Sequence, residues 1–123
     1  MSQALSVVIF RVILEGIERY QSDPESEDRV VTEVARKLLP VVRASLSKED
    51  KCSINGPGIM TAVMRAEQQG AESVAKRTQE IVQATPVRIG MVGREVKVTV
   101  AYSSLTFPLR EQSGNMTMSL ISQ

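Results

Sequence analysis

The residues that could support chemistry are few, and their types narrow the choice of reactions. The chain of 123 residues has no histidine and one cysteine, Cys52. Histidine is the commonest general base near neutral pH and the commonest metal ligand in proteins. Serine triads, histidine-based zinc sites and cysteine–histidine nucleophiles are therefore excluded. Fourteen aspartates and glutamates remain, so carboxylate and metal chemistry is the catalytic chemistry left to this sequence.

The overall composition excludes several classes of partner. A net charge of +1 provides no field that would attract nucleic acid or an anionic membrane. The four aromatic residues are too scattered for a base-stacking platform. The longest apolar stretch, Ala4 to Leu14, is interrupted by Arg11 and is far shorter than a membrane span requires. It has no basic segment before it and is followed at once by Glu15, so a signal peptide is not expected. We therefore expect a cytoplasmic protein, with no cofactor and no disulfide, that binds neither nucleic acid nor membrane.

Hydrophobic patterning in the first half of the chain predicts a strand, a helix and a hairpin. The Val- and Ile-rich run 5–14 is typical of a buried strand. Residues 22–28 read as a polar loop before a helix over 29–46, in which Pro40 predicts a kink or a break. The alternating segment 51–64 predicts a hairpin. Its turn is expected at Asn55-Gly56, widened by Pro57 and Gly58.

The second half repeats the same plan. A helix is predicted over 67–83, ended by Thr85-Pro86, and a second hairpin over 87–107 around the turn 90–93. The order strand, helix, hairpin, helix, hairpin favours an α+β fold: an antiparallel sheet with helices on one face, in a ferredoxin-like or nucleotide-cyclase palm arrangement. Residues 108–123 form a tail of different character, interpreted either as a short edge strand or as a strand lent to a neighbouring subunit.

The sequences of these predicted elements resemble those of a known family. Residues 27–38 are similar to the first long helix of GGDEF (diguanylate cyclase) domains, and the first hairpin falls where that family keeps its signature turn. Residues 75–82 and 94–104 resemble the family's second helix and a later strand. The likeness extends over about residues 5–107, which suggests one degenerate GGDEF-like domain over 1–107 followed by the tail 108–123.

The positions that carry function in the family hold other residues here. The signature Gly-Gly-Asp/Glu-Glu-Phe matches Asn55-Gly56-Pro57-Gly58-Ile59, so Pro57 and Gly58 stand where the resemblance implies the two acids. The first-strand metal-binding aspartate corresponds to Arg11. This arginine should repel Mg²⁺ rather than bind it.

Two further family sites are also altered. The guanine-recognising Asn and Asp correspond to Arg19 and Tyr20. The inhibitory product-binding motif Arg-x-x-Asp aligns with the segment from Ser47 to Asp50 and lacks its arginine, although Lys48 or Arg43 could replace it as a phosphate contact. The family's final helix, with its lysine toward the phosphates, has no counterpart after residue 107.

These substitutions predict a domain that is not an enzyme and holds no metal. The favoured function is a protein-interaction or dimerisation module in bacterial signalling or assembly, with a protein partner or a homodimer. One alternative is a non-catalytic sensor that binds GTP or cyclic di-guanylate weakly through Arg11, Arg19 or Arg43. The other is an unrelated ferredoxin-like structural subunit that self-associates. We also expect Arg11 to face outward or to pair with Glu15 or Glu95, and Cys52 to be a small core residue.

Overall fold

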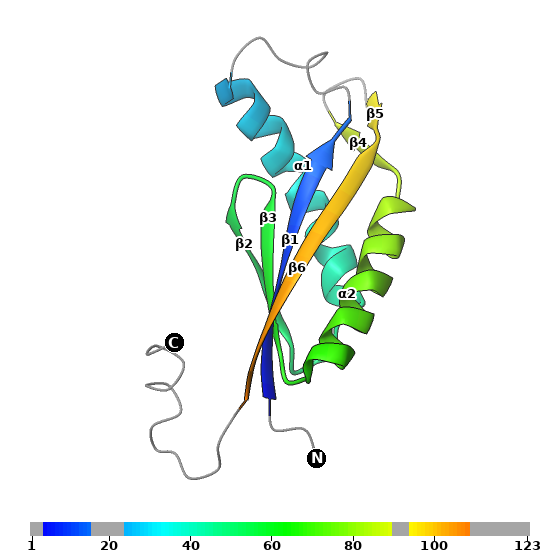
Figure 1. The fold of residues 1–123 in the computed structure, drawn as a ribbon. Coiled ribbons are helices and arrows are strands. Elements are labelled where there is room, and N and C mark those ends of the chain that lie inside the picture. The colour runs from blue at the N-terminus through cyan, green and yellow to red at the C-terminus, as the bar shows by residue number, and fades with distance from the viewer. Residues whose placement is uncertain (1–3, 16–23, 90–93, 109–123) are drawn as a thin grey trace.

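The structure is a computed structural model that describes residues 4–15, 24–89 and 94–108 (Figure 1). Its elements follow in the order β1 (Ala4–Leu14), α1 (Pro24–Ala44), β2 (Lys51–Gly56), β3 (Ile59–Met64), α2 (Gln68–Gln83), β4 (Val87–Ile89), β5 (Arg94–Val96) and β6 (Val98–Pro108). The expected tail, from residue 109 on, and the turn 90–93 lie outside the described residues.

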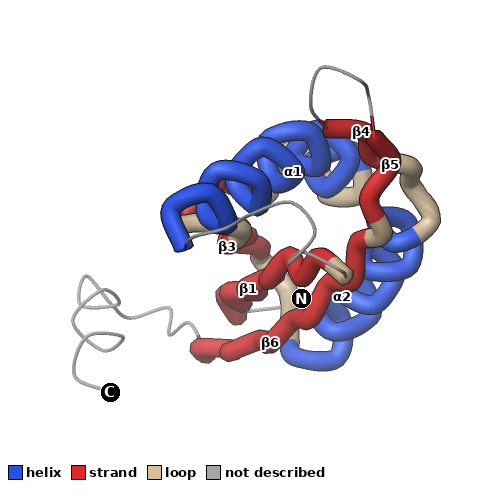
Figure 2. Tube along the Cα trace, turned by 90° about the horizontal axis from the view of Figure 1, so that it is seen from above, coloured by secondary structure: helices blue, strands red, loops and turns tan. Residues whose placement is uncertain are grey.

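Four strands form one antiparallel sheet in the order β2-β3-β1-β6. Both helices lie on the same side of this sheet (Figure 2). This confirms the predicted α+β architecture with helices on one face. Strand β1 is central because it pairs with β3 on one side and along its whole length with β6 on the other.

Alternation along β1 decides which side chains enter the core. Val8, Phe10 and Val12 are buried toward the helices, and Ile9 and Ile13 are exposed on the opposite face. This follows from the two-residue period of a strand with one face covered by helices. The helices supply the other half of the core through the buried residues Val34, Ala35, Leu38 and Val42 of α1 and Ala71, Ala75, Thr78 and Val82 of α2.

Helix α1 differs from its predicted form at two points. It begins at Pro24, inside the expected polar loop. Proline suits the first turn of a helix, because backbone N–H groups there have no acceptor within the helix and the lack of one costs nothing. It also continues through Pro40 to Ala44, so of the predicted kink or break the break is absent. Pro40 and Arg36, whose carbonyl loses its partner, are both exposed near the end of the helix, where water can replace the missing hydrogen bond.

The first hairpin is confirmed, but its turn lies two residues later than expected. Asn55 and Gly56 belong to β2, and the turn residues are Pro57 and Gly58. Gly58 has φ +70°, and no other described residue has a positive φ. Proline followed by a left-handed glycine is a combination that type II turns favour, so Pro57-Gly58 takes the place of Asn55-Gly56. The register shift between Ile54 and Gly56 accommodates this turn.

The second predicted hairpin is divided between two sheets. Strands β4 and β5 pair only with each other, whereas β6 leaves this ribbon after Lys97 and pairs with β1. The expectation of a single strand over 94–107 was therefore wrong at Lys97. The backbone carbonyl of Lys97 instead accepts a hydrogen bond from the backbone N–H of Glu15 at the end of β1.

Within the described residues, neither helix is long and apolar enough to cross a membrane.

Candidate functional site

The turn between β2 and β3 is held against the end of β1. The backbone N–H of Val12 donates a hydrogen bond of 2.8 Å to the carbonyl of Gly58. Gly58 is buried, and on its other side it faces α1. The turn is thus enclosed between a central strand and a helix, and its tip is not a free loop.

Position 58 has no room for a side chain. A Cβ atom built there would lie 2.1 Å from Cγ1 of Val31 and 3.4 Å from the carbonyl oxygen of Val12. The positive φ of Gly58 adds a second constraint, since residues with a Cβ rarely adopt it. Val31 belongs to the apolar face of α1 that packs on the core. Glycine is therefore required by both the local backbone and the helix.

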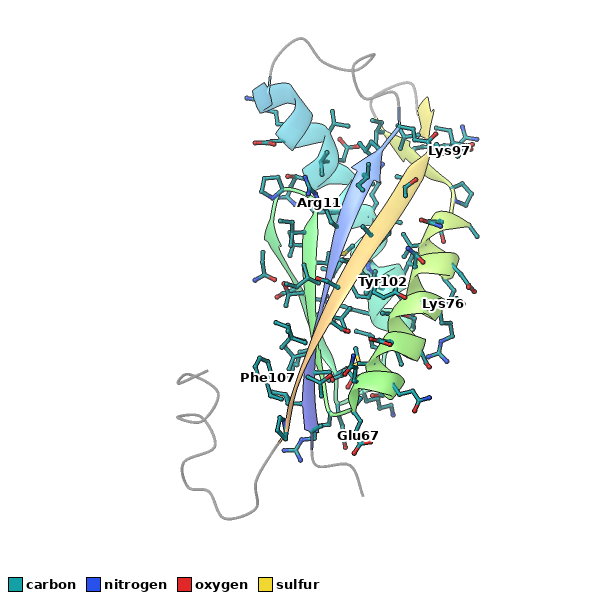
Figure 3. The ribbon with its side chains drawn as sticks, in the orientation of Figure 1. Arg11, Glu67, Lys76, Lys97, Tyr102 and Phe107 are labelled. Atoms are coloured by element: carbon teal, nitrogen blue, oxygen red, sulfur yellow. The ribbon has the colours of Figure 1, made fainter. Side chains whose placement is uncertain are left out.

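Arg11 lies beside this turn on the face of the sheet that the helices leave open (Figure 3). It is exposed, and it stands opposite Ile59 on β3 and Ala101 on β6. Of the two predicted arrangements, the outward-facing one is confirmed; no ion pair or hydrogen bond joins the Arg11 side chain to Glu15, Glu95 or another described residue. Glu15 instead lies 3.7 Å from Lys97. Arg11 therefore places a positive charge among apolar neighbours.

A groove of about 750 Å³ lies between the end of α1 and the outer face of the β2–β3 hairpin. At its rim, Ser47 donates to a carboxylate oxygen of Asp50 through both its hydroxyl, at 2.8 Å, and its backbone N–H, at 3.0 Å. These bonds close the turn that connects α1 to β2. One oxygen of the Asp50 carboxylate is thus engaged by hydrogen bonds within the chain.

The cations that line the groove differ in how they are held. The Arg43 guanidinium donates two hydrogen bonds, of 3.2 and 3.0 Å, to the backbone carbonyl of Cys52. This holds Arg43 along the edge of β2. Lys48 and Lys51 also line the groove and are exposed.

Cys52 is a buried free thiol, as predicted. Burial raises the pKa of this thiol, and the charge of Arg43 opposes part of that rise. A raised pKa keeps the sulfur protonated near neutral pH. Cys52 is therefore a small core residue without nucleophilic character. Among the described residues no three Asp, Glu or Cys side chains gather in a way that could hold a metal ion.

Comparison with known proteins identifies the fold. No family model and no curated protein matches the chain. Solved structures do match: the diguanylate cyclase SiaD of Pseudomonas aeruginosa, in complex with its activator SiaC, has a TM-score of 0.62 at 19% identity over 95% of this chain and 43% of its own. The coiled coil and GGDEF domain of DgcB from Caulobacter crescentus, in complex with c-di-GMP, has a TM-score of 0.67 at 8% identity over 98% and 60%. The FimX GGDEF domain from Pseudomonas aeruginosa has a TM-score of 0.63 at 15% identity over 95% and 70%.

The chain has a GGDEF-like fold. It spans less than half of the SiaD chain and 60% of the DgcB chain. At these identities the likeness shows the fold alone. The GGDEF-like fold explains why a turn in the middle of the sequence meets the first strand: antiparallel pairing of β1 with β3 places Arg11 opposite Ile59.

The structure locates only some of the other residues that the GGDEF-like alignment singled out. Arg19 and Tyr20, at the positions matched to guanine recognition, lie outside the described residues. Ser47 and Asp50 lie at the groove, away from Arg11. The alignment gave no role to Val31 of α1, whose side chain fills the space beside Gly58. Its apolar character and helical spacing mark a core residue, but only the folded chain shows that it faces the turn.

Proposed function

We propose that this chain is a non-catalytic GGDEF-like domain that acts as a protein-interaction or dimerisation module. The observation that carries the proposal is the contact between position 58 and Val31. By the family resemblance, position 58 corresponds to the second acid of the signature. A glutamate there would need both a Cβ where Val31 stands and a left-handed backbone that favours glycine.

The charge of Arg11 supports the same conclusion. Two-metal phosphoryl transfer needs carboxylates that hold divalent cations against the phosphates of the substrate. By resemblance Arg11 corresponds to the metal-binding aspartate, and its nearest partners across the sheet are Ile59 and Ala101. None of the three side chains can ligate a cation. The site thus combines a repelling charge with a turn that has no space for the acid.

An interaction role is supported by the open face of the sheet. Ile9 of β1 and Leu105 of β6 are exposed there, at 39% and 63% of their surface, and they lie at neighbouring positions of two paired strands. Neighbouring exposed apolar side chains favour contact with another protein. SiaD, one of the structural neighbours, was solved in complex with a protein activator. Protein binding by a GGDEF-containing chain therefore has a structural parallel.

A second candidate function, sensing of cyclic di-guanylate or GTP, is favoured by the groove beside β2. Lys48 and Lys51 line it together with Arg43, and such cations attract phosphates. Against this candidate, Arg43 already donates two hydrogen bonds to the Cys52 carbonyl. The groove would therefore have to bind phosphates through two exposed lysines alone.

Calorimetric titration of the full chain separates the two candidates. The ligands are cyclic di-guanylate, and GTP with Mg²⁺. The interaction module predicts no binding heat for either ligand. Micromolar binding of cyclic di-guanylate that is lost in Lys48→Ala, with Lys76→Ala on the outer face of α2 as the matched control, would replace it with the sensor. Binding of GTP would likewise favour the sensor, whereas conversion of the bound GTP to cyclic di-guanylate would contradict both candidates.

A further inference from the structure

Strand β6 is an edge strand of the main sheet, and among the described residues α2 hydrogen-bonds to its outer edge only at Val100. The side-chain amide of Gln79 donates a 2.6 Å hydrogen bond to the carbonyl of Val100. The N–H of Val100 donates a 3.0 Å bond to the side-chain oxygen of Gln83. The two glutamines thus satisfy the outward-facing backbone groups of Val100, as a neighbouring strand would.

The edge beyond Val100 lacks such cover. Successive residues of a strand direct their backbone groups to opposite sides, so the N–H and C=O groups of Tyr102, Ser104 and Thr106 face the same way as those of Val100. Among the described residues no other backbone or side chain hydrogen-bonds to these outward groups. Three consecutive pairing positions of a long strand therefore have no partner in the part of the chain that the structure describes, an arrangement that favours pairing with another strand.

The composition of β6 strengthens this interpretation. Its eleven residues, VTVAYSSLTFP, contain no charged side chain. Edge strands in soluble proteins are commonly protected by lysine or another charge, and β6 has only Pro108, at its last position. Leu105 lies within the open section and is 63% exposed, more than any other large apolar side chain described. The lower part of β6, with Phe107 near its end, is seen in Figure 3.

We propose that the open edge of β6 pairs with the same edge of a second copy of this chain. The pairing is antiparallel about a two-fold axis at Ser104, the middle of the three open positions. In this register Tyr102 faces Thr106 of the other copy, and Leu105 faces Ser103. No like charges meet, because β6 has none. The two sheets join into one of eight strands. This inference rests on the proposed function and names the partner.

Charge and symmetry both favour a second copy of this chain as the partner of the open β6 edge. An unrelated charged strand would find no opposite charge on β6. A second β6 satisfies all three open positions in one register, as an isologous interface requires. Face-to-face packing of two open sheet faces is disfavoured, because it would bury Arg11 of each copy, and the residues opposite Arg11 on β3 and β6 are Ile59 and Ala101, which cannot pair with its charge.

Light scattering coupled to size-exclusion chromatography of the full chain, from micromolar to millimolar concentration, tests the proposal. We expect the mass to rise toward twice 13.5 kDa. Leu105→Lys should weaken association at least about tenfold, since a lysine at the edge opposes strand pairing. Ile13→Lys, on the same face but on the central strand β1, is the matched control and should associate like the unmodified chain. A monomer at all concentrations, or a dimer equally affected by both substitutions, would overturn the proposal.

A cross-linking experiment checks the register. Ser104→Cys brings two thiols opposite each other across the axis, at a Cα separation of about 5.5 Å that suits a disulfide. Oxidation should give a covalent dimer, whereas Thr99→Cys and the unmodified chain, whose Cys52 is buried, should not.

Hydrogen exchange of the backbone amides provides a further test of the pairing. Amides 102, 104 and 106 should exchange quickly in dilute protein and slowly in concentrated protein. Slow exchange in the dilute monomer would show that another part of the same chain covers the edge and would overturn the dimer.

Failure of the edge pairing and failure of the proposed function give different experimental results. A monomer that neither binds nor converts GTP would overturn the edge pairing and leave the domain non-catalytic. A dimer through β6 that forms cyclic di-guanylate would overturn the non-catalytic assignment and leave the edge pairing in place.

Discussion

Gly58 of the β2–β3 turn and Val31 of α1 are packed so closely that a Cβ atom on the glycine would lie 2.1 Å from Cγ1 of the valine. This contact links the first helix to the tip of the hairpin. It also defines what the turn can hold, because any side chain at position 58 has to displace the side chain of Val31.

The first prediction concerns that contact. Gly58→Ala should lower the free energy of unfolding by about 2–5 kcal/mol, since it adds backbone strain at positive φ to an overpacked contact. Gly56→Ala is the matched control: its Cβ would meet only Ile59 at an ordinary 3.7 Å, so a small change is expected. Urea unfolding of both variants measures the difference. If Val31→Ala combined with Gly58→Ala recovers none of the loss, the contact with Val31 is not the cause.

The second prediction concerns the glutamines that cover β6. Replacing both Gln79 and Gln83 by alanine leaves the N–H and C=O of Val100 without their partners. Each lost bond to a half-buried backbone group costs about 1 kcal/mol, so we expect a loss of about 1–3 kcal/mol in unfolding free energy. Gln69→Ala, exposed on the same helix, is the control. Exchange of the Val100 amide should also accelerate; unchanged exchange would argue that the glutamines do not protect this edge.

A third prediction concerns Ser6, a fully buried hydroxyl at the other end of the sheet. It donates to the carbonyl of Ala66 at 2.7 Å and shares a 2.8 Å hydrogen bond with the hydroxyl of Thr106. Ser6→Ala should cost about 1–3 kcal/mol, because it leaves polar groups of the β3–α2 connection and of β6 unsatisfied. Ser53→Ala, exposed on β2, is expected to change the stability little. Thermal unfolding of the two variants compares them, and equal midpoints would contradict the prediction.

The fourth prediction follows from the raised pKa of the Cys52 thiol, caused mainly by its burial. A group that holds its proton more tightly when folded supports stability below its unfolded pKa and loses that contribution as the pH rises through its folded pKa. The unfolding free energy should therefore fall as the pH rises above the ordinary thiol pKa, about 8.5. Cys52→Ala should lack this part of the decline. Parallel pH profiles for the two proteins would refute the assignment.

Much of this fold could be predicted from the sequence because its signals are local. The alternating run of β1 and the helical spacing of Val34, Leu38 and Val42 require no knowledge of the rest of the chain. The turn was misplaced because Asn55-Gly56 and Pro57-Gly58 are both good turn sequences, and the choice between them depends on packing against Val12 and α1.

The site was harder to predict than the fold, because its decisive contacts join distant residues. The distance between Val31 and Gly58 and the capture of Glu15 by Lys97 instead of Arg11 depend on how the strands are arranged. The departure of β6 from the β4–β5 ribbon is of the same kind: pairing with β1 along eleven residues outweighs a longer local hairpin. Residue spacing alone carries no signal for any of these three.

The most direct test of the central claim is product formation under permissive conditions. The purified full chain, at concentrations where two copies would meet, is incubated with GTP and either Mg²⁺ or Mn²⁺, and cyclic di-guanylate is sought by mass spectrometry, with an active diguanylate cyclase as the positive control. We expect no product above the protein-free background. Product that forms in proportion to the amount of protein, and that disappears when the metal is chelated, would contradict a non-catalytic domain.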